Sequence, residues 1–162
     1  MGLFNKKKSG PLQMTAPMKG QIIDITEVPD SVFAEKYVGD GIAIYPTEGK
    51  VYSPVDGEIV LVAETGHAIG IKTKEGFEII IHVGLETVAM KGEGFESLIS
   101  EGDKVSVGQL LLNFDLELVK ERAKSTVSPV VISNMEVVEH IEKNGLAGDK
   151  HVLMTVYEKL ST

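Results

Sequence analysis

Residues 67–82 read HAIGIKTKEGFEIIIH, and the pattern of this stretch decides which fold to expect. Two apolar runs flank the polar loop Lys74-Glu75-Gly76, in which glycine can adopt the left-handed backbone of a tight turn. The pattern predicts a β-hairpin that begins at His67 and ends at His82.

The register of this hairpin decides whether the two histidines meet. With a two-residue loop, His67 lies directly across from His82, and their Cβ atoms are ~5 Å apart on one face. If Gly76 forms a bulge, the register shifts by one residue and the imidazoles fall on opposite faces. The residues themselves leave both registers open. Two imidazoles on one face would suit phosphoryl transfer or a metal such as zinc.

In the aligned register, Ile69, Ile71 and Ile80 share the face of the two imidazoles. Apolar side chains around polar ones on an outward face suggest a docking surface. The alternative is that both faces are buried, as in a sandwich interior, with the histidines hydrogen-bonded locally.

Composition narrows the class of protein. The 162 residues suit one domain with a proper core, and the absence of cysteine excludes disulfides and cysteine-based zinc sites in this chain. A net charge of −8 argues against nucleic acid as a partner. No apolar run has the length of a membrane span or the character of a signal peptide, so we expect a cytoplasmic protein without stable membrane insertion.

Short β-branched runs separated by glycine, proline and acidic turns continue along the chain. They predict strands at 13–16, 21–25, 41–45, 50–53, 58–63, 67–73, 77–82, 110–114, 129–132 and 152–157. The one credible helix is 117–124, so the fold class is all-β, an antiparallel sandwich or barrel with one or two short helices. We expect one domain over residues 13–162, preceded by a disordered tail of residues 1–12.

Two segments of the sequence resemble each other. SPVDGEIV at 53–60 repeats the pattern of APMKGQII at 16–23, in which a Pro-x-x-Gly turn leads into a β-branched strand. This repetition predicts an internal duplicated motif.

Several longer motifs occur in a recognisable order. They are VFAEK at 32–36, VGDGIAI at 38–44, PVDG at 54–57, ETGHA at 64–68, HVG at 82–84, KGEGF at 91–95 and PVVISNM at 129–135. Together they resemble the glucose-type enzyme IIA of the bacterial phosphoenolpyruvate-dependent sugar phosphotransferase system, from about Ala16 to Tyr157.

This resemblance implies a phosphotransferase component with adjacent histidines in a shallow apolar depression, and it selects the aligned register. By the same likeness His82 accepts a phosphoryl group on Nε2 from the small phosphocarrier HPr and passes it to a cysteine on the IIB domain of a sugar permease. His67 would hydrogen-bond the phosphoryl group, and Thr65 would orient His67. The carbonyl of Gly84 would accept a hydrogen bond from Nδ1 of His82. No cofactor is required by this chemistry.

The implied partner-binding residues form an apolar docking surface with two carboxylates beside it. The apolar members are Phe33, Val38, Ile69, Ile71 and Ile80. Asp30 and Glu86 would pair with an arginine on HPr. The alternative for both carboxylates is a solvated surface, and for Asp30 a turn residue after Pro29.

Two other function classes remain to be weighed. A zinc peptidase of related sandwich fold could use His67 and His82 as ligands, but it needs a third ligand, and Ile80 occupies the position where a second histidine of a His-x-His pair would stand. A regulatory module could dock on permeases or metabolic enzymes and release them when phosphorylated, because added negative charge opposes apolar docking.

Overall fold

The computed structural model describes residues 10–160, which form thirteen strands, two α-helices and three 3-10 helices. The strands are β1 (Leu12–Met14), β2 (Gly20–Asp24), β3 (Asp40–Pro46), β4 (Lys50–Tyr52), β5 (Gly57–Val62), β6 (Ala68–Lys72), β7 (Glu78–His82), β8 (Phe95–Ser97), β9 (Lys104–Val105), β10 (Leu110–Phe114), β11 (Ser128–Ile132), β12 (Val138–Glu142) and β13 (Met154–Glu158). The helices are α1 (Ser31–Ala34), α2 (Leu116–Arg122), η1 (Ile25–Glu27), η2 (Thr87–Met90) and η3 (Met135–Val137).

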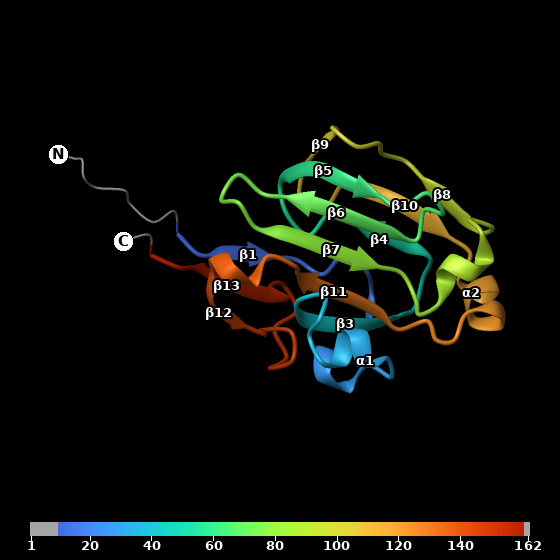
Figure 1. Ribbon diagram of the computed structural model, residues 1–162, viewed down its shortest axis with the longest axis horizontal. Coiled ribbons are helices and arrows are strands. Elements are labelled where there is room, and N and C mark those ends of the chain that lie inside the picture. The colour runs from blue at the N-terminus through green and yellow to red at the C-terminus, as the bar shows by residue number, and fades with distance from the viewer. Residues whose placement is uncertain (1–9, 161–162) are drawn as a thin grey trace.

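The strands form one large sheet and two small ones. The large sheet has the order β2-β3-β11-β7-β6-β5-β9, and the small sheets have the orders β4-β10-β8 and β1-β13-β12. The pairs of neighbouring strands are antiparallel. Figure 1 shows β4 and β10 behind β6 and β7, as in a sandwich. The predicted all-β class is confirmed.

The main core lies between the large sheet and the two small sheets. Ile71, Ile79 and Ile81 point inward from β6 and β7 and are at most 1% exposed. Val51 of β4 and Leu111 of β10 belong to the same buried cluster and are fully buried. Branched side chains suit these strands because they pack closely on a pleated surface.

A second, smaller apolar cluster lies on the outer face of the large sheet. Phe33 of α1 packs there with Ala43 of β3 and Val131 of β11, and Val38 and Ile80 are partly buried against them. The segment that contains α1 therefore covers part of this face, below β3 and β11 in Figure 1. The α1 segment leaves the outer face of β5, β6 and β7 uncovered near the end of β7.

The two similar turns lie beside each other in the structure. The Tyr52 N–H donates to the Pro17 carbonyl at 2.7 Å, and the Thr15 N–H donates to the Pro54 carbonyl at 3.0 Å. One turn leads into β2 and the other into β5. The sequence duplication thus corresponds to two equivalent strand entries in the large sheet.

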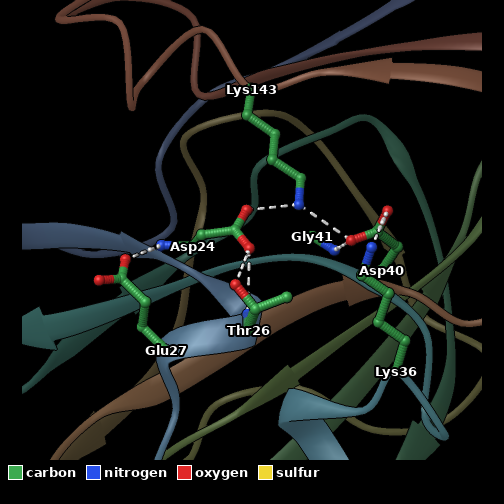
Figure 2. Close-up of polar contacts among 7 residues, drawn as sticks. All are labelled: Asp24, Thr26, Glu27, Lys36, Asp40, Gly41 and Lys143. Carbon is green, nitrogen blue, oxygen red and sulfur yellow. Dashed lines mark hydrogen bonds and ion pairs between the residues drawn. The ribbon is translucent and has the colours of Figure 1, made fainter.

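A lysine fastens the loop after β12 to the large sheet (Figure 2). Lys143 Nζ lies 2.6 Å from Asp24 Oδ1 and 2.9 Å from Asp40 Oδ1. Burial by itself would raise the pKa of Asp24, but hydrogen bonds from Lys143 and Thr26 outweigh it and lower the pKa to about 2. The cation is therefore shared by two carboxylates that the fold brings together from β2 and β3.

Three expectations about the ends and the number of strands and helices differ from the structure. Leu12, expected in the tail, pairs with Val156 in β1, and the rest of the predicted tail lies mostly outside the described residues. Asp115 caps α2 by accepting from the Leu118 N–H at 3.1 Å, so the helix begins at Leu116 rather than at the expected Glu117. Strands β8, β9 and β12 were not expected.

Among residues 10–160, no helix has both the length and the apolar composition to cross a membrane.

Candidate active site

The β6–β7 hairpin has the shifted register, not the aligned register that the family resemblance implied. Its loop is three residues long and ends with Gly76 at φ +97°, and the Thr73 N–H donates to the Phe77 carbonyl at 2.9 Å. Ala68, rather than His67, therefore lies opposite His82. The aligned register is wrong because a left-handed glycine adds one residue to the turn.

The two imidazoles nevertheless meet. His67 precedes β6 and lies outside the regular ladder, where its carbonyl accepts a hydrogen bond from the Val83 N–H at 2.7 Å. The ring centroids of His67 and His82 are 4.9 Å apart, with an angle of 75° between the planes. The alternation of faces that would have separated them applies only within a strand.

The hydrogen bonding of His82 fixes which of its nitrogens is free. Nδ1 lies 2.7 Å from the carbonyl oxygen of Gly84, and a carbonyl can only accept, so Nδ1 carries the proton. Burial lowers the pKa of His82 and outweighs the Gly84 carbonyl and the charge of Asp30, which both raise it. The ring is therefore neutral near pH 7, and its Nε2 has an available lone pair.

His67 is buried, and the Thr65 side chain contacts its Nδ1 atom. The Thr65 hydroxyl lies 2.5 Å from Nδ1 of His67. Burial, followed by repulsion from His82, lowers the pKa of His67 to about 4. The site thus contains two neutral imidazoles near pH 7, and neither ring carries a positive charge before phosphorylation.

The tight connection between β5 and β6 positions Thr65 and His67. The Ala63 N–H donates to the Ala68 carbonyl at 3.0 Å, and the Gly66 N–H donates to the Ala63 carbonyl at 2.7 Å. Gly66 has φ +76°, a conformation that glycine adopts without steric strain. This loop places the Thr65 hydroxyl against Nδ1 of His67, and the His67 ring against His82 at the end of β7.

Helix α1 contributes one ring and one carboxylate to the surroundings of His82. The Phe33 ring packs edge-on against it, with 5.1 Å between centroids and 62° between planes. Asp30 caps the helix by accepting from the Val32 N–H at 2.9 Å, so it is more than a plain turn residue. Glu86 is exposed and has a left-handed backbone immediately before η2.

Comparison with known proteins places the chain in a family. The family described as phosphoenolpyruvate-dependent sugar phosphotransferase system, EIIA 1, matches residues 12–138. The chain belongs to this family. It is therefore a component of the phosphotransferase system, and this membership supports a phosphocarrier role.

Relatives and a solved structure agree with this membership. The EIIA chain is 56% identical over 144 residues to a glucose-specific EIIA component of Bacillus cereus, with 88% of this chain and 87% of the relative covered. It is 43% identical over 162 residues to a glucose-specific EIIA component of Haemophilus influenzae, with 94% and 98% covered. The glucose permease IIA from Mycoplasma capricolum has the same fold, with a TM-score of 0.79, 36% identity, and 96% of this chain and 99% of that one covered.

The apolar surface beside the histidines of this EIIA chain differs from the expected set. Ile69 and Ile71 are at most 1% exposed and face the main core, because a register shift of one residue exchanges the two faces of a strand. Ile80 lies on the outer face, as expected, and is half-buried. Leu61, which was not among the predicted residues, is 41% exposed. It lies on the face of Ile80, because a Cβ added at Gly70 would be 2.9 Å from Leu61 Cβ and 3.4 Å from Ile80 Cδ1.

We name a set of four apolar side chains of this face the docking surface. Its members are Phe33, Val38, Leu61 and Ile80. A patch of this kind next to an imidazole with a free Nε2 suits contact with another protein.

A metal site would need more ligands than the EIIA chain gathers here. Within residues 10–160, no group of three or more His, Cys, Asp or Glu side chains is placed to hold a metal ion. The two imidazoles offer two of the three or four protein ligands that zinc usually takes. The peptidase alternative therefore lacks its third ligand in the described part of the chain.

Proposed function

We propose that this chain is a phosphocarrier that accepts a phosphoryl group from phospho-HPr on Nε2 of His82 and passes it to the IIB domain of a glucose-type sugar permease in the cytoplasm. The observation that carries the proposal is the 2.7 Å hydrogen bond from Nδ1 of His82 to the Gly84 carbonyl. It leaves Nε2 of a neutral, half-buried ring as the nucleophile. The names of the relatives support the sugar class.

The proposed first step exchanges one phosphorus–nitrogen bond for another. The lone pair on Nε2 of His82 forms a bond to phosphorus while the bond to the HPr histidine breaks, and that histidine keeps the electron pair. Phosphoryl transfer of this kind depends on in-line positioning and on stabilising charge on the phosphoryl oxygens. The second step repeats the exchange, with a cysteine thiolate of the IIB domain as the nucleophile.

His67 supplies the charge stabilisation in this scheme. If the Thr65 hydroxyl donates to Nδ1 of His67 across their 2.5 Å contact, the proton of His67 resides on Nε2. That N–H can then donate to an oxygen of the phosphoryl group on His82, since the rings are in edge contact. A neutral donor stabilises the phosphoryl group without trapping it as a permanent ion pair would.

The docking surface provides a water-poor setting for both transfers. Phe33 packs on His82, and Leu61 and Ile80 add apolar side chains on the same face of the sheet. Excluding water between two proteins keeps the phosphoryl group from hydrolysis during transfer. Asp30 and Glu86, together with the net charge of −8, favour partners with a basic surface.

Phosphorylation would also alter what this surface binds. A phosphoryl group adds about −1.5 to −2 charges, which opposes docking of an apolar partner face. Regulation of permeases or metabolic enzymes through the phosphorylation state is therefore compatible with the carrier role.

The test is phosphoryl transfer to the protein from phosphoenolpyruvate through enzyme I and HPr. The protein is incubated with phosphoenolpyruvate, enzyme I and HPr, and its intact mass is measured. We expect one added phosphoryl group on the wild type and on His140→Ala, because His140 is an exposed histidine stacked on Tyr157 in β13. We expect none on His82→Ala. Labelling of His82→Ala, or an unlabelled wild type, would contradict the proposal.

A further inference from the structure

Two buried hydroxyl groups hold the peptide bond between Val83 and Gly84. The Thr87 hydroxyl donates to the Val83 carbonyl at 2.7 Å, and the Gly84 N–H donates to the Ser128 hydroxyl at 3.0 Å. Thr87 and Ser128 are both fully buried. The two poles of a single peptide group are thus each fixed by a side chain from outside the strand.

This peptide sits where the backbone has the most freedom. Gly84 has φ +69°, and an added Cβ would lie 2.7 Å from Thr87 Cγ2 and 3.0 Å from the Ser125 carbonyl oxygen. The position therefore requires glycine, and glycine has the widest choice of backbone conformations. Its orientation has to be imposed by contacts with neighbouring groups.

The next peptide carries the carbonyl that contacts His82. Its Leu85 N–H donates to the Ser125 carbonyl at 2.9 Å, and its Gly84 carbonyl accepts from Nδ1 of His82 at 2.7 Å. The two peptide planes on either side of Gly84 are therefore both restrained. Ser128 restrains the first plane and is itself fixed, because its hydroxyl donates to the Thr126 carbonyl at 2.9 Å.

We propose that Ser128 and Thr87 are positioning residues for phosphoryl transfer. By fixing the Val83–Gly84 peptide, they hold the Gly84 carbonyl against Nδ1 of His82, and this contact keeps the proton off Nε2. The inference deepens the proposed function and rests on it for its consequence in transfer. The effect on the protonation of His82 does not depend on that function.

Loss of either hydroxyl would release the peptide. In Ser128→Ala the buried Gly84 N–H loses its acceptor, and reorientation of the peptide becomes the way to regain one. The carbonyl of Gly84 then moves away from Nδ1, and His82 populates the tautomer with its proton on Nε2. That form has no Nε2 lone pair, so acceptance from HPr should slow by about tenfold, the lower end of the loss seen when an outer-shell partner of a metal-bound histidine is removed.

The experiment reads the tautomer directly by long-range proton–nitrogen NMR of protein labelled with nitrogen-15 in histidine. We expect the wild type to carry the proton on Nδ1 of His82, and Ser128→Ala and Thr87→Val to show a clear Nε2–H population. Ser128→Thr and Thr87→Ser keep a hydroxyl and should restore the wild-type tautomer. Rates of phosphoryl acceptance from HPr are measured on the same samples.

A matched control separates positioning from general destabilisation. Ser53 is also fully buried, and its hydroxyl donates to the Val55 carbonyl at 2.6 Å, away from the histidines. Ser53→Ala should lower stability and leave both the tautomer and the acceptance rate at wild-type values. If Ser128→Ala does not fold, Thr87→Val carries the same test.

The possible outcomes are distinct. A wild-type tautomer in Ser128→Ala and Thr87→Val would overturn the positioning role, as would an equal change in Ser53→Ala. If the wild type accepts no phosphoryl group, the proposed function fails, and the tautomer comparison still decides whether the two hydroxyls orient His82.

Discussion

Mild acid should destabilise the folded protein through His67. Burial and the neighbouring His82 lower the pKa of His67 from 6.5 to about 4. Between these two pH values the unfolded chain binds a proton that the folded protein does not, so acidification favours unfolding. The gap, multiplied by 1.36 kcal/mol per pH unit, gives a loss of about 3 kcal/mol by pH 4. Above about pH 6.5 this penalty is absent.

The measurement is urea unfolding of the wild type and of His67→Gln at several pH values between about 7 and 4. The glutamine cannot titrate, so the difference between the two pH profiles isolates the contribution of His67 from that of the carboxylates. His140→Gln is the matched control, because His140 is exposed. It shows what removing a histidine outside the site does to the profile.

A parallel loss of stability in the wild type and in His67→Gln would contradict this prediction. It would mean that His67 binds its proton equally well in the folded and unfolded states. The His67 ring would then be solvated, and the site would not be the apolar, water-poor environment that burial of His67 indicates.

Other predictions follow from single contacts. Lys143→Met should lower the free energy of unfolding by about 2 kcal/mol, because Asp24 and Asp40 lose their shared cation; that difference should fade as the pH falls toward 2, where Asp24 protonates. Ile80→Glu should weaken HPr binding in calorimetry while costing about 1 kcal/mol of stability, and an unfolded variant would contradict its outward position. His67→Gln should still accept phosphoryl groups from HPr but donate slowly to a IIB domain, and normal donation would remove His67 from the mechanism. EDTA should leave transfer from HPr unchanged, whereas a loss restored by zinc would show that a metal takes part.

The sequence predicted the hairpin and most of the large sheet, because the β-branched runs there are long and the turn residues are clear. It did not predict β9, which is two residues long, or β12, whose sequence VEHIE is mostly polar. Short strands of this kind are defined by their neighbours. For β12 the partner is β13, which forms the centre of its sheet.

The hairpin register shows what a local pattern leaves undetermined. Lys74-Glu75-Gly76 is compatible with a loop of two or three residues, and the choice depends on Gly76 and on Thr73, whose hydroxyl accepts from the Phe77 N–H at 3.2 Å. The resemblance to a family favoured adjacent histidines correctly and the aligned register wrongly. His67 reaches His82 from the loop before the strand, which alternation along a strand does not describe.

The sequence predicted contacts of the two histidines with residues nearby in the chain, but not contacts around Gly84 with residues distant in the chain. Thr65 and Gly84 each lie two residues from the histidine they contact, within the recognised motifs. Ser128 is 44 residues from Gly84, and no spacing pattern connects them. The nearest signal is that Ser128 directly precedes the PVVISNM motif, but the motif gives no role for the hydroxyl. Leu61 was missed because it follows a register shift between β5 and β6.

NMR can locate the proposed bond between phosphorus and Nε2 of His82. Protein labelled with nitrogen-15 in histidine is phosphorylated by phosphoenolpyruvate, enzyme I and HPr, and coupling between phosphorus and the ring nitrogens is measured by NMR. We expect phosphorus bonded to Nε2 of His82, with the proton on Nδ1 retained by the Gly84 carbonyl. Phosphorus on Nδ1, on His67 or on any other residue would contradict it.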